Sequence, residues 1–347
     1  MNNLLLLILF DDDDDDDIVR RSRIIRPRMN WFDTFDDEDF VQRFRLTKVM
    51  TREVFEQIEA RITPDSPLNN AIPPMTQMLV AMRFLATGSF YITIGDFTGI
   101  SKTSVWRIVH RVSEAIAGLR ERYIYIPPSH QEIRAIHSQN FSQAAFPRVL
   151  GAINCVHVRV CSYGGEYAEL FRNRKSFFSI NTQVIVNSRL EIIDIVSRWP
   201  GSAHDATIFD NSRIKRRFEN GEFYNSLLVG DSAYSQVPFI MTPLHNPMTP
   251  AEVLYNESQI RTRTMVERCF GVWGRMFAVL TIGSRFFKSE LSMHAIIASA
   301  VLYNVTRRAI PQSLINQRAY DQIPETHQQL IQNQQRHIIN NYFHNLL

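Results

Sequence analysis

The sequence predicts an α/β protein in which a mixed β-sheet domain follows an α-helical region. Between about Trp31 and Glu121, apolar residues recur three and four positions apart, as they do in amphipathic helices. From Leu150 onward, short runs rich in Val and Ile replace this pattern and predict strands. A long helical pattern, ESQIRTRTMVERCFGVWGRMFAVL, comes after the last of these runs. With 347 residues, 45% of them hydrophobic, the chain can bury a substantial core.

Residues 1–30 are predicted to be a disordered tail, because they combine a short apolar run with strongly charged segments. Asp11–Asp17 is a run of seven acids, and the basic patch Arg20–Arg28 follows it. The patch indicates either a nuclear import signal or a solvated run of charge. We therefore expect the nucleus as the location, with the cytoplasm left open. The apolar run Leu4–Phe10 is too short to span a membrane, so no membrane association is expected.

The distribution of charge and the cysteines narrow the class of protein. Without the aspartate run the chain has 28 acidic against 38 basic residues, a net charge of +10, which favours a polyanion such as DNA as partner. The three cysteines form neither a disulfide framework nor a zinc-finger spacing. A reducing compartment is expected.

Residues 31–125 are predicted to form a helical domain that contains a helix-turn-helix. A short helix around Ile94–Phe97, a turn at Gly99 and a helix capped by Ser101 make up this motif. The second helix places four polar residues away from its apolar stripe: Lys102, Thr103, Arg107 and Arg111. This face suits a DNA groove. The alternative is a three-helix unit that uses the same turn only for packing.

Residues 126–310 are predicted to form the sheet domain, and residues 311–347, rich in Gln, Asn and His, a polar C-terminal tail. The first three strands are expected to be antiparallel neighbours at Leu150–Val160, Ser179–Val186 and Leu190–Val196. HDATIFDNSRIKRRF reads as one helix, and SLLVGD as a short strand buried on both faces.

Three polar positions on this framework form a candidate site. Asn154 lies on the valine-rich face of the first strand. Asp231 follows a buried strand, where open α/β sheets gather functional groups, although such an aspartate often only satisfies turn backbone. Glu267 lies within the long helix, where a surface ion pair with Arg263 would also account for it.

Taken together, the three positions follow the order found in ribonuclease-H-like nucleases. In such sites, carboxylates hold two divalent ions about 4 Å apart across the scissile phosphodiester. Oxygen ligands suit Mg²⁺ or Mn²⁺. The sequence thus predicts a ribonuclease-H-like domain with catalytic positions Asn154, Asp231 and Glu267, and with Asp231, Glu267 and Asp205 as candidate metal ligands.

Several stretches resemble the PIF/Harbinger superfamily of DDE transposase-like nucleases. The resemblance spans about Phe40–Arg308 and rests on GAINCVHVRV, RNRKSFFSINTQVIVN, SRWPGSAHDATIFDNS, LLVGDSAYSQVPFIMTPL and MVERCFGVWGRMF. It implies metal-dependent hydrolysis of DNA, a Myb/SANT-like protein partner, and an acidic triad at the positions held here by Asn154, Asp231 and Glu267. The first position departs from that pattern, because it holds an amide.

An amide offers one neutral oxygen where a carboxylate offers two that share a negative charge. We expect this substitution to weaken cleavage at least ~10-fold. Two functions stay open: a weakened nuclease, or a catalytically inactive DNA- or partner-binding protein of the same descent. A third alternative is an α/β protein whose acids are all structural. Arg172, Arg174 and Lys175 are predicted phosphate contacts, unless their loop is merely solvated.

Overall fold

The computed structural model describes residues 27–66, 70–234, 237–283, 289–310 and 334–347. The aspartate run and almost all of the basic patch predicted as an N-terminal tail lie outside the described residues, as does most of the predicted C-terminal tail. Within the described part, none of the helices is long and apolar enough to cross a membrane.

The described chain up to residue 124 is helical. Its helices are α2 (Trp31–Thr34), α3 (Asp37–Phe44), α4 (Lys48–Ile62), α5 (Pro74–Thr87), α6 (Tyr91–Thr98), α7 (Lys102–Ala117) and α8 (Arg120–Tyr123). The sequence explains where α6 ends and α7 begins. Gly99 adopts a left-handed φ of 67° after α6, which favours glycine. The Ser101 side chain then accepts a hydrogen bond from Ser104 N and caps α7.

Five strands form one mixed sheet in the order β3-β2-β1-β4-β5. They are β1 (Val149–Arg159), β2 (Ser179–Val186), β3 (Ile192–Pro200), β4 (Leu227–Val229) and β5 (Ile240–Met241). The antiparallel pairing of the first three strands is confirmed, and β4 runs parallel to β1. The mixed α/β class predicted from the sequence is therefore correct.

The third strand begins two residues later than predicted. Leu190 has a left-handed φ of 59°, so it belongs to the turn and not to the strand. Asn187 Oδ1 stabilises this turn by accepting hydrogen bonds from Arg189 N and Glu191 N, each 3.0 Å long. A single residue in the αL conformation is enough to break the extended pattern.

The helix predicted over HDATIFDNSRIKRRF is wrong as one element, because two helices replace it. They are α10 (Asp205–Asp210) and α11 (Arg213–Glu219). Ser212 divides them, since its side chain accepts from Lys215 N and starts a new helix.

The remaining elements follow the prediction more closely. α9 (His130–Ala144) precedes the sheet, and η1 (Ala168–Phe171) and η2 (Ser232–Tyr234) are short 3₁₀ turns. The long helix is α12 (Pro250–Met276), which begins upstream of the predicted segment at a capping box of Thr249 and Glu252. After it come α13 (Val279–Ile282), α14 (Ser289–Arg308), α15 (Gln334–Ile338), η4 (Ile339–Phe343) and η5 (His344–Leu346).

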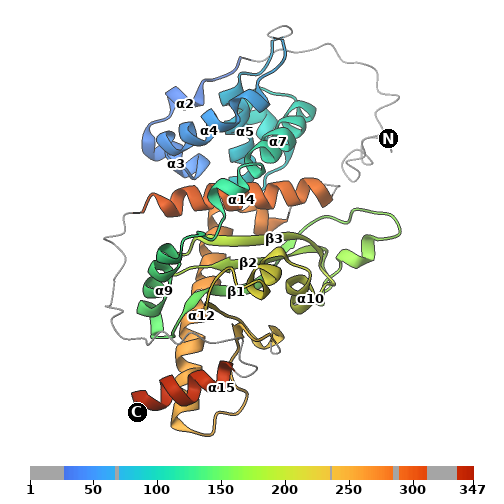
Figure 1. Ribbon diagram of the computed structural model, residues 1–347. Helices are drawn as coiled ribbons and strands as arrows, with labels where there is room; N and C mark the ends of the chain where they lie inside the picture. The colour runs from blue at the N-terminus through green and yellow to red at the C-terminus, as the bar shows by residue number, and fades with distance from the viewer. Residues whose placement is uncertain (1–26, 67–69, 235–236, 284–288, 311–333) are drawn as a thin grey trace.

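The two faces of the sheet bury different helices. Ala152, Val184 and Val229 belong to the large core cluster that also contains residues of α12, α14 and the N-terminal helices. Ile153 and Ile185, whose side chains point the opposite way, belong to a second cluster with residues of α9, α10 and α11. In Figure 1, α14 lies between the N-terminal helices and the sheet.

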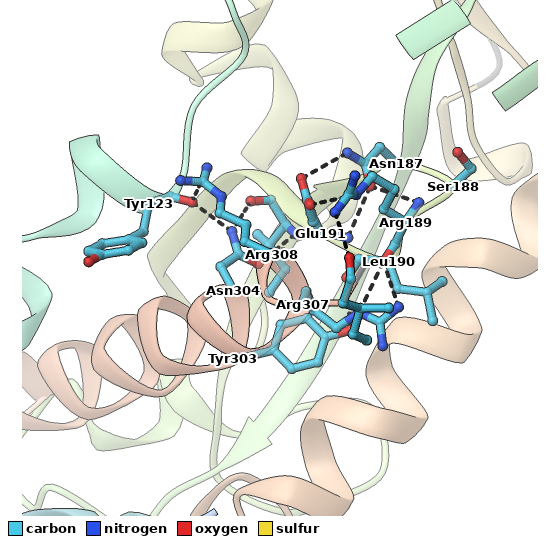
Figure 2. A network of polar contacts seen from close by, with 12 residues as sticks. Tyr123, Asn187, Ser188, Arg189, Leu190, Glu191, Tyr303, Asn304, Arg307 and Arg308 are labelled. Carbon is cyan, nitrogen blue, oxygen red and sulfur yellow. Dashed lines mark hydrogen bonds and ion pairs between the residues drawn. The ribbon is translucent and has the colours of Figure 1, made fainter. Parts of the chain in front are cut away.

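The C-terminal end of α14 joins the helical region to the β2–β3 turn through polar contacts (Figure 2). Arg307 donates twice to Arg189 O, at 3.0 and 2.8 Å, and Tyr303 OH donates to Leu190 O at 2.8 Å. Arg308 donates to Tyr123 O at 2.9 Å. These contacts satisfy backbone carbonyls at the ends of two elements far apart in sequence.

The described C-terminal segment packs on the protein. Phe343 is buried against Phe146 and Tyr255, with ring centroids 5.7 and 5.6 Å apart. Ile338 and Ile339 are buried beside it. This part of the sequence is mostly polar, so its composition does not indicate that these three apolar residues are buried.

Candidate active site

The register of β1 and β4 puts Asn154 and Asp231 at the same level of two neighbouring chain segments. Ala152 pairs with Val229, and the two polar residues each lie two positions beyond this pair in the same direction. Neighbouring strands are about 4.8 Å apart. The intervening Gly230 passes so close to β1 that a Cβ on it would lie 3.1 Å from Ile153 Cγ2. Glycine at 230 therefore allows the chain carrying Asp231 to stay against β1.

Helix α12 crosses this junction and carries Glu267 past it. Gln259 Nε2 donates to Gly230 O at 2.7 Å and to Met241 O at 3.0 Å, which fixes the helix against the end of β4. Eleven residues later, Phe270 lines a cavity together with Val156 of β1. Glu267 lies between these two anchors. The structure thus places the elements that carry positions 154, 231 and 267 side by side.

Glu267 is an exposed member of a stripe of α12 whose other residues are half-buried. Arg263, Phe270 and Gly274 occupy the same stripe by helical spacing, and the last two face β1 across the cavity. The ion pair expected from the spacing is present, with 2.7 Å between Arg263 Nη1 and Glu267 Oε1. Half of the Glu267 side chain is exposed, so the ion pair is weak and Glu267 can exchange Arg263 for another cation.

The three candidate side chains already have partners in the chain. Asn154 Oδ1 accepts from Cys155 N at 2.8 Å, and Asp231 Oδ1 accepts from Ala233 N at 3.0 Å. The described residues contain no group of three or more His, Cys, Asp or Glu side chains placed to hold a metal ion. Two carboxylates suit one divalent cation, but the set is one anionic ligand short of a site for two.

Asp205 is held on the other face of the sheet. Its Oδ1 accepts from Asn181 Nδ2 at 3.0 Å, and its carboxylate acts on the Cys155 thiol. The Cys155 and Asn181 side chains share the face of Ile153, opposite to that of Asn154. Asp205 therefore approaches the sheet from the face opposite to Asn154, while its carboxylate and that of Asp231 both act on Cys155 and Tyr234.

Cys155, Tyr234 and Asp205 form a polar cluster on that opposite face, in which Tyr234 is buried and the other two are half-buried. Cys155 Sγ lies 3.4 Å from Tyr234 OH. Burial, and then the Asp205 carboxylate, raise the pKa of the Cys155 thiol well above its usual value. The thiol therefore stays protonated and is unsuited to act as a nucleophile.

The predicted phosphate contacts of the RNRK loop differ in availability. Arg172 is paired with Glu169 at 2.7 Å and covers the Phe178 ring, and Arg174 donates to His204 Nδ1. Lys175 is exposed. On α7, Lys102, Thr103, Arg107 and Arg111 are all exposed, but Arg111 Nη2 donates to Gln77 Oε1.

Two residues that position the candidate side chains are not predicted from the sequence. Gln259 supports the loop of Asp231, and Asn181 holds Asp205. Both are completely buried polar side chains. A polar residue within an apolar stretch is the signal that could have indicated them, but the sequence does not say which backbone group each one satisfies.

Comparison with known proteins adds independent information on this site. A family profile described as DDE superfamily endonuclease matches residues 153–304, a range that contains Asn154, Asp231 and Glu267. No solved structure matches this chain.

Curated relatives match over most of the chain. "Putative nuclease HARBI1" of Homo sapiens is 32% identical over 253 residues, which is 72% of this chain and 72% of the relative. The protein of the same name in Xenopus laevis is 27% identical over 68% of this chain and 69% of its own length. "Protein ALP1-like" of Arabidopsis thaliana is 24% identical over 58% of this chain and 54% of its own length.

Proposed function

Because the chain belongs to the family of Harbinger transposase-derived nucleases, we propose that it binds DNA and hydrolyses its phosphodiester bonds at a rate lowered by Asn154. One observation carries the proposal: β1, the end of β4 and α12 lie side by side, and two of the three positions keep their carboxylates. We also propose a ribonuclease-H-like organisation for the sheet domain. The strand order and the mixed pairing support it.

In this proposal Asp231 and Glu267 would hold one Mg²⁺ or Mn²⁺ ion, once Glu267 leaves Arg263. The bound cation would neutralise charge that develops on the phosphodiester and lower the pKa of an attacking water. Gln259 keeps Asp231 in place through Gly230 O. We propose a supporting role for Asp205, which is held by Asn181 Nδ2.

Asn154 takes a different role from the acid of the family pattern. Its Oδ1 is used by Cys155 N, while Nδ2 has no hydrogen bond to another described residue. An amide N–H is a donor, and donors suit phosphate oxygens and not cations. Asn154 is therefore suited to bind the DNA backbone at the position where a carboxylate would have bound metal.

This chemistry also supports the second candidate function, a DNA-binding protein without cleavage. The contacts made by Asn154 Oδ1 and Glu267 favour it, because Cys155 N and Arg263 occupy these oxygens without a metal. Both candidates have DNA as the partner, and both fit a nuclear location. The Myb/SANT-like protein partner stays a proposal that rests on family membership alone.

A cleavage assay separates the two candidates. Supercoiled plasmid is incubated with Mn²⁺ or Mg²⁺ and with the native protein, Asn154→Asp, or Asn154→Asp combined with Glu267→Gln. We expect Asn154→Asp to cut at least ~10-fold faster than the native protein, and the double variant to lose this gain. If none of the three cuts while all still bind DNA, the binding function replaces the nuclease. If the native protein does not bind DNA, both candidate functions are refuted.

A further inference from the structure

A cavity of about 250 Å³ lies beside the candidate site, between β1, α12 and α13. Its walls come from the second half of β1, from Phe177 just before β2, from the last turns of α12, and from α13. The lining residues include Val156, Arg159, Phe177, Phe270, Trp273 and Thr281.

The inner wall of the cavity is rigid and apolar. Trp273 is only 1% exposed, and its indole Nε1 donates to Ser299 Oγ at 3.1 Å. Val158 is buried next to it. At the rim, the Arg159 guanidinium lies over the Phe177 ring at 4.3 Å from the centroid. The cavity therefore combines flat apolar surfaces with a cationic group that can meet a polar edge.

The position of the cavity relates it to the candidate site. Val156 follows Asn154 by two residues on the same face of β1, a distance of roughly 7 Å. Phe270 follows Glu267 by one helical turn, a rise of about 5 Å. If the phosphate of a nucleotide lies at the candidate site, the base of that nucleotide or of the next one can therefore reach the cavity.

From these features we infer that the cavity binds one unstacked nucleobase of the DNA strand at the candidate site; the inference rests on the proposed function. The volume is below the roughly 300–1,000 Å³ of sites for drug-sized ligands, so it suits a single ring system. Enzymes that do chemistry on a DNA base hold the extruded base by stacking it between aromatic and apolar side chains, which shows that such surfaces suit a base. Arginine and aromatic rings are also the usual partners of single-stranded bases.

The test compares a strand with bases to one without them. Fluorescence anisotropy measures the binding of labelled ten-nucleotide oligothymidine and of an abasic strand of the same length, without added metal. The abasic strand reports phosphate contacts alone. We expect the native protein to bind oligothymidine about tenfold more tightly, because one stacked base contributes roughly that factor.

Two variants on α13 locate the effect. Thr281→Phe fills the cavity from an exposed position, and Ile282→Phe adds the same ring to the neighbouring residue, which is 55% exposed and does not line the cavity. Thr281→Phe should bind both strands equally, and Ile282→Phe should keep the tenfold difference. Circular dichroism confirms that each variant is folded.

Three outcomes would overturn the inference. If the native protein binds both strands with equal affinity, no base is held. If Thr281→Phe keeps the difference, the base is held elsewhere. If neither strand binds, the proposed function fails, and the inference fails with it.

Discussion

The side-chain amide of Asn304 holds the backbone of Ile192 through both of its polar atoms. Asn304 Oδ1 accepts from Ile192 N at 3.0 Å, and Nδ2 donates to Ile192 O at 2.7 Å. The same Nδ2 donates to Tyr123 O at 2.7 Å (Figure 2). Asn304 is completely buried, so one amide joins α14 to the first residue of β3 and the last residue of α8.

Replacing Asn304 with Leu should destabilise the protein strongly. The variant keeps the side-chain volume but leaves the N–H and the C=O of Ile192 without their side-chain partner, and each buried orphan costs about 1–3 kcal/mol. Tyr123 O keeps its hydrogen bond from Arg308. We expect the free energy of unfolding, measured by urea denaturation, to fall by at least ~2 kcal/mol.

Asn256 provides a matched control. It makes the same pair of contacts with Leu244, at 2.8 and 2.9 Å, but it is only half-buried and lacks the third contact. Asn256→Leu should therefore cost less than half as much as Asn304→Leu, because water can reach the groups that are left. Equal losses in the two variants would mean that burial does not set the cost.

His137 should make the fold sensitive to acid. Its Nε2 lies 2.9 Å from Ser226 Oγ, and Ser226 OH itself donates to Phe223 O, so the ring donates from Nε2. Burial, followed by the charges of Arg148, His130 and Arg134, lowers the pKa of His137 to about 4.

Because the folded-state pKa of His137 is below the unfolded value of about 6.5, the unfolded state takes up the proton first as the pH falls. The stability is complete above pH 6.5 and is lost between about 6.5 and 4. We expect this residue to account for a decrease of about 2 kcal/mol between pH 7.5 and pH 5. His137→Gln, measured by urea denaturation at both pH values, should show a correspondingly smaller decrease.

Asp194 should have the opposite pH dependence. Burial raises the pKa of its carboxyl to about 6, although Arg120, Arg217 and Arg213 act to lower it. Its Oδ2 is buried without a hydrogen bond to the described residues. Since the folded state favours the protonated acid, the ionised group costs stability increasingly as the pH rises from about 4 through 6.

Asp194→Asn should therefore stabilise the protein at pH 8 and leave its stability nearly unchanged at pH 4. The pKa shift corresponds to about 3 kcal/mol at pH 8. We expect a smaller gain of about 2 kcal/mol, because the residue keeps some contact with solvent, which weakens the effect of burial. Thermal unfolding at the two pH values measures it. A variant that is less stable at pH 8 would show that the three arginines stabilise the carboxylate by more than burial destabilises it.

The sequence predicts the fold well where local chemistry decides it. β2 has the predicted bounds, because its run of Ile and Val lies between polar turns. Ser101 caps α7 as expected, because an N-cap needs only the backbone of the following turn. The break at Ser212 was missed, because apolar residues at helical spacing continue on both sides of it. Such a break depends on which of two local hydrogen bonds forms, and periodicity carries no information about it.

The candidate site could be predicted only to the level of its elements. The order of Asn154, Asp231 and Glu267 along the chain indicates strands and a helix that meet, and the structure places these elements together. The face taken by Asp205 could not be predicted, because it follows from the packing of α10 on β2. The same limit applies to the contact of Arg111 with Gln77, which joins residues 34 positions apart.

That contact leads to a prediction about α7, in which two exposed arginines should behave differently toward DNA. No hydrogen bond or ion pair joins the Arg107 side chain to another described residue, whereas Arg111 is held by Gln77. A free guanidinium can neutralise a phosphate and release a counterion, which contributes about 0.9 to the slope of log K against log salt concentration. We expect Arg107→Ala to lower the slope by about this amount and to weaken binding to all DNA sequences alike.

Arg111→Ala should change the slope less and should instead lower the unfolding temperature, because Gln77 is buried and loses its partner. Anisotropy titrations between 50 and 200 mM salt, with a thermal melt of each variant, measure both effects. If Arg107→Ala leaves affinity and slope unchanged, the polar face of α7 does not contact DNA, and the turn before it serves only for packing.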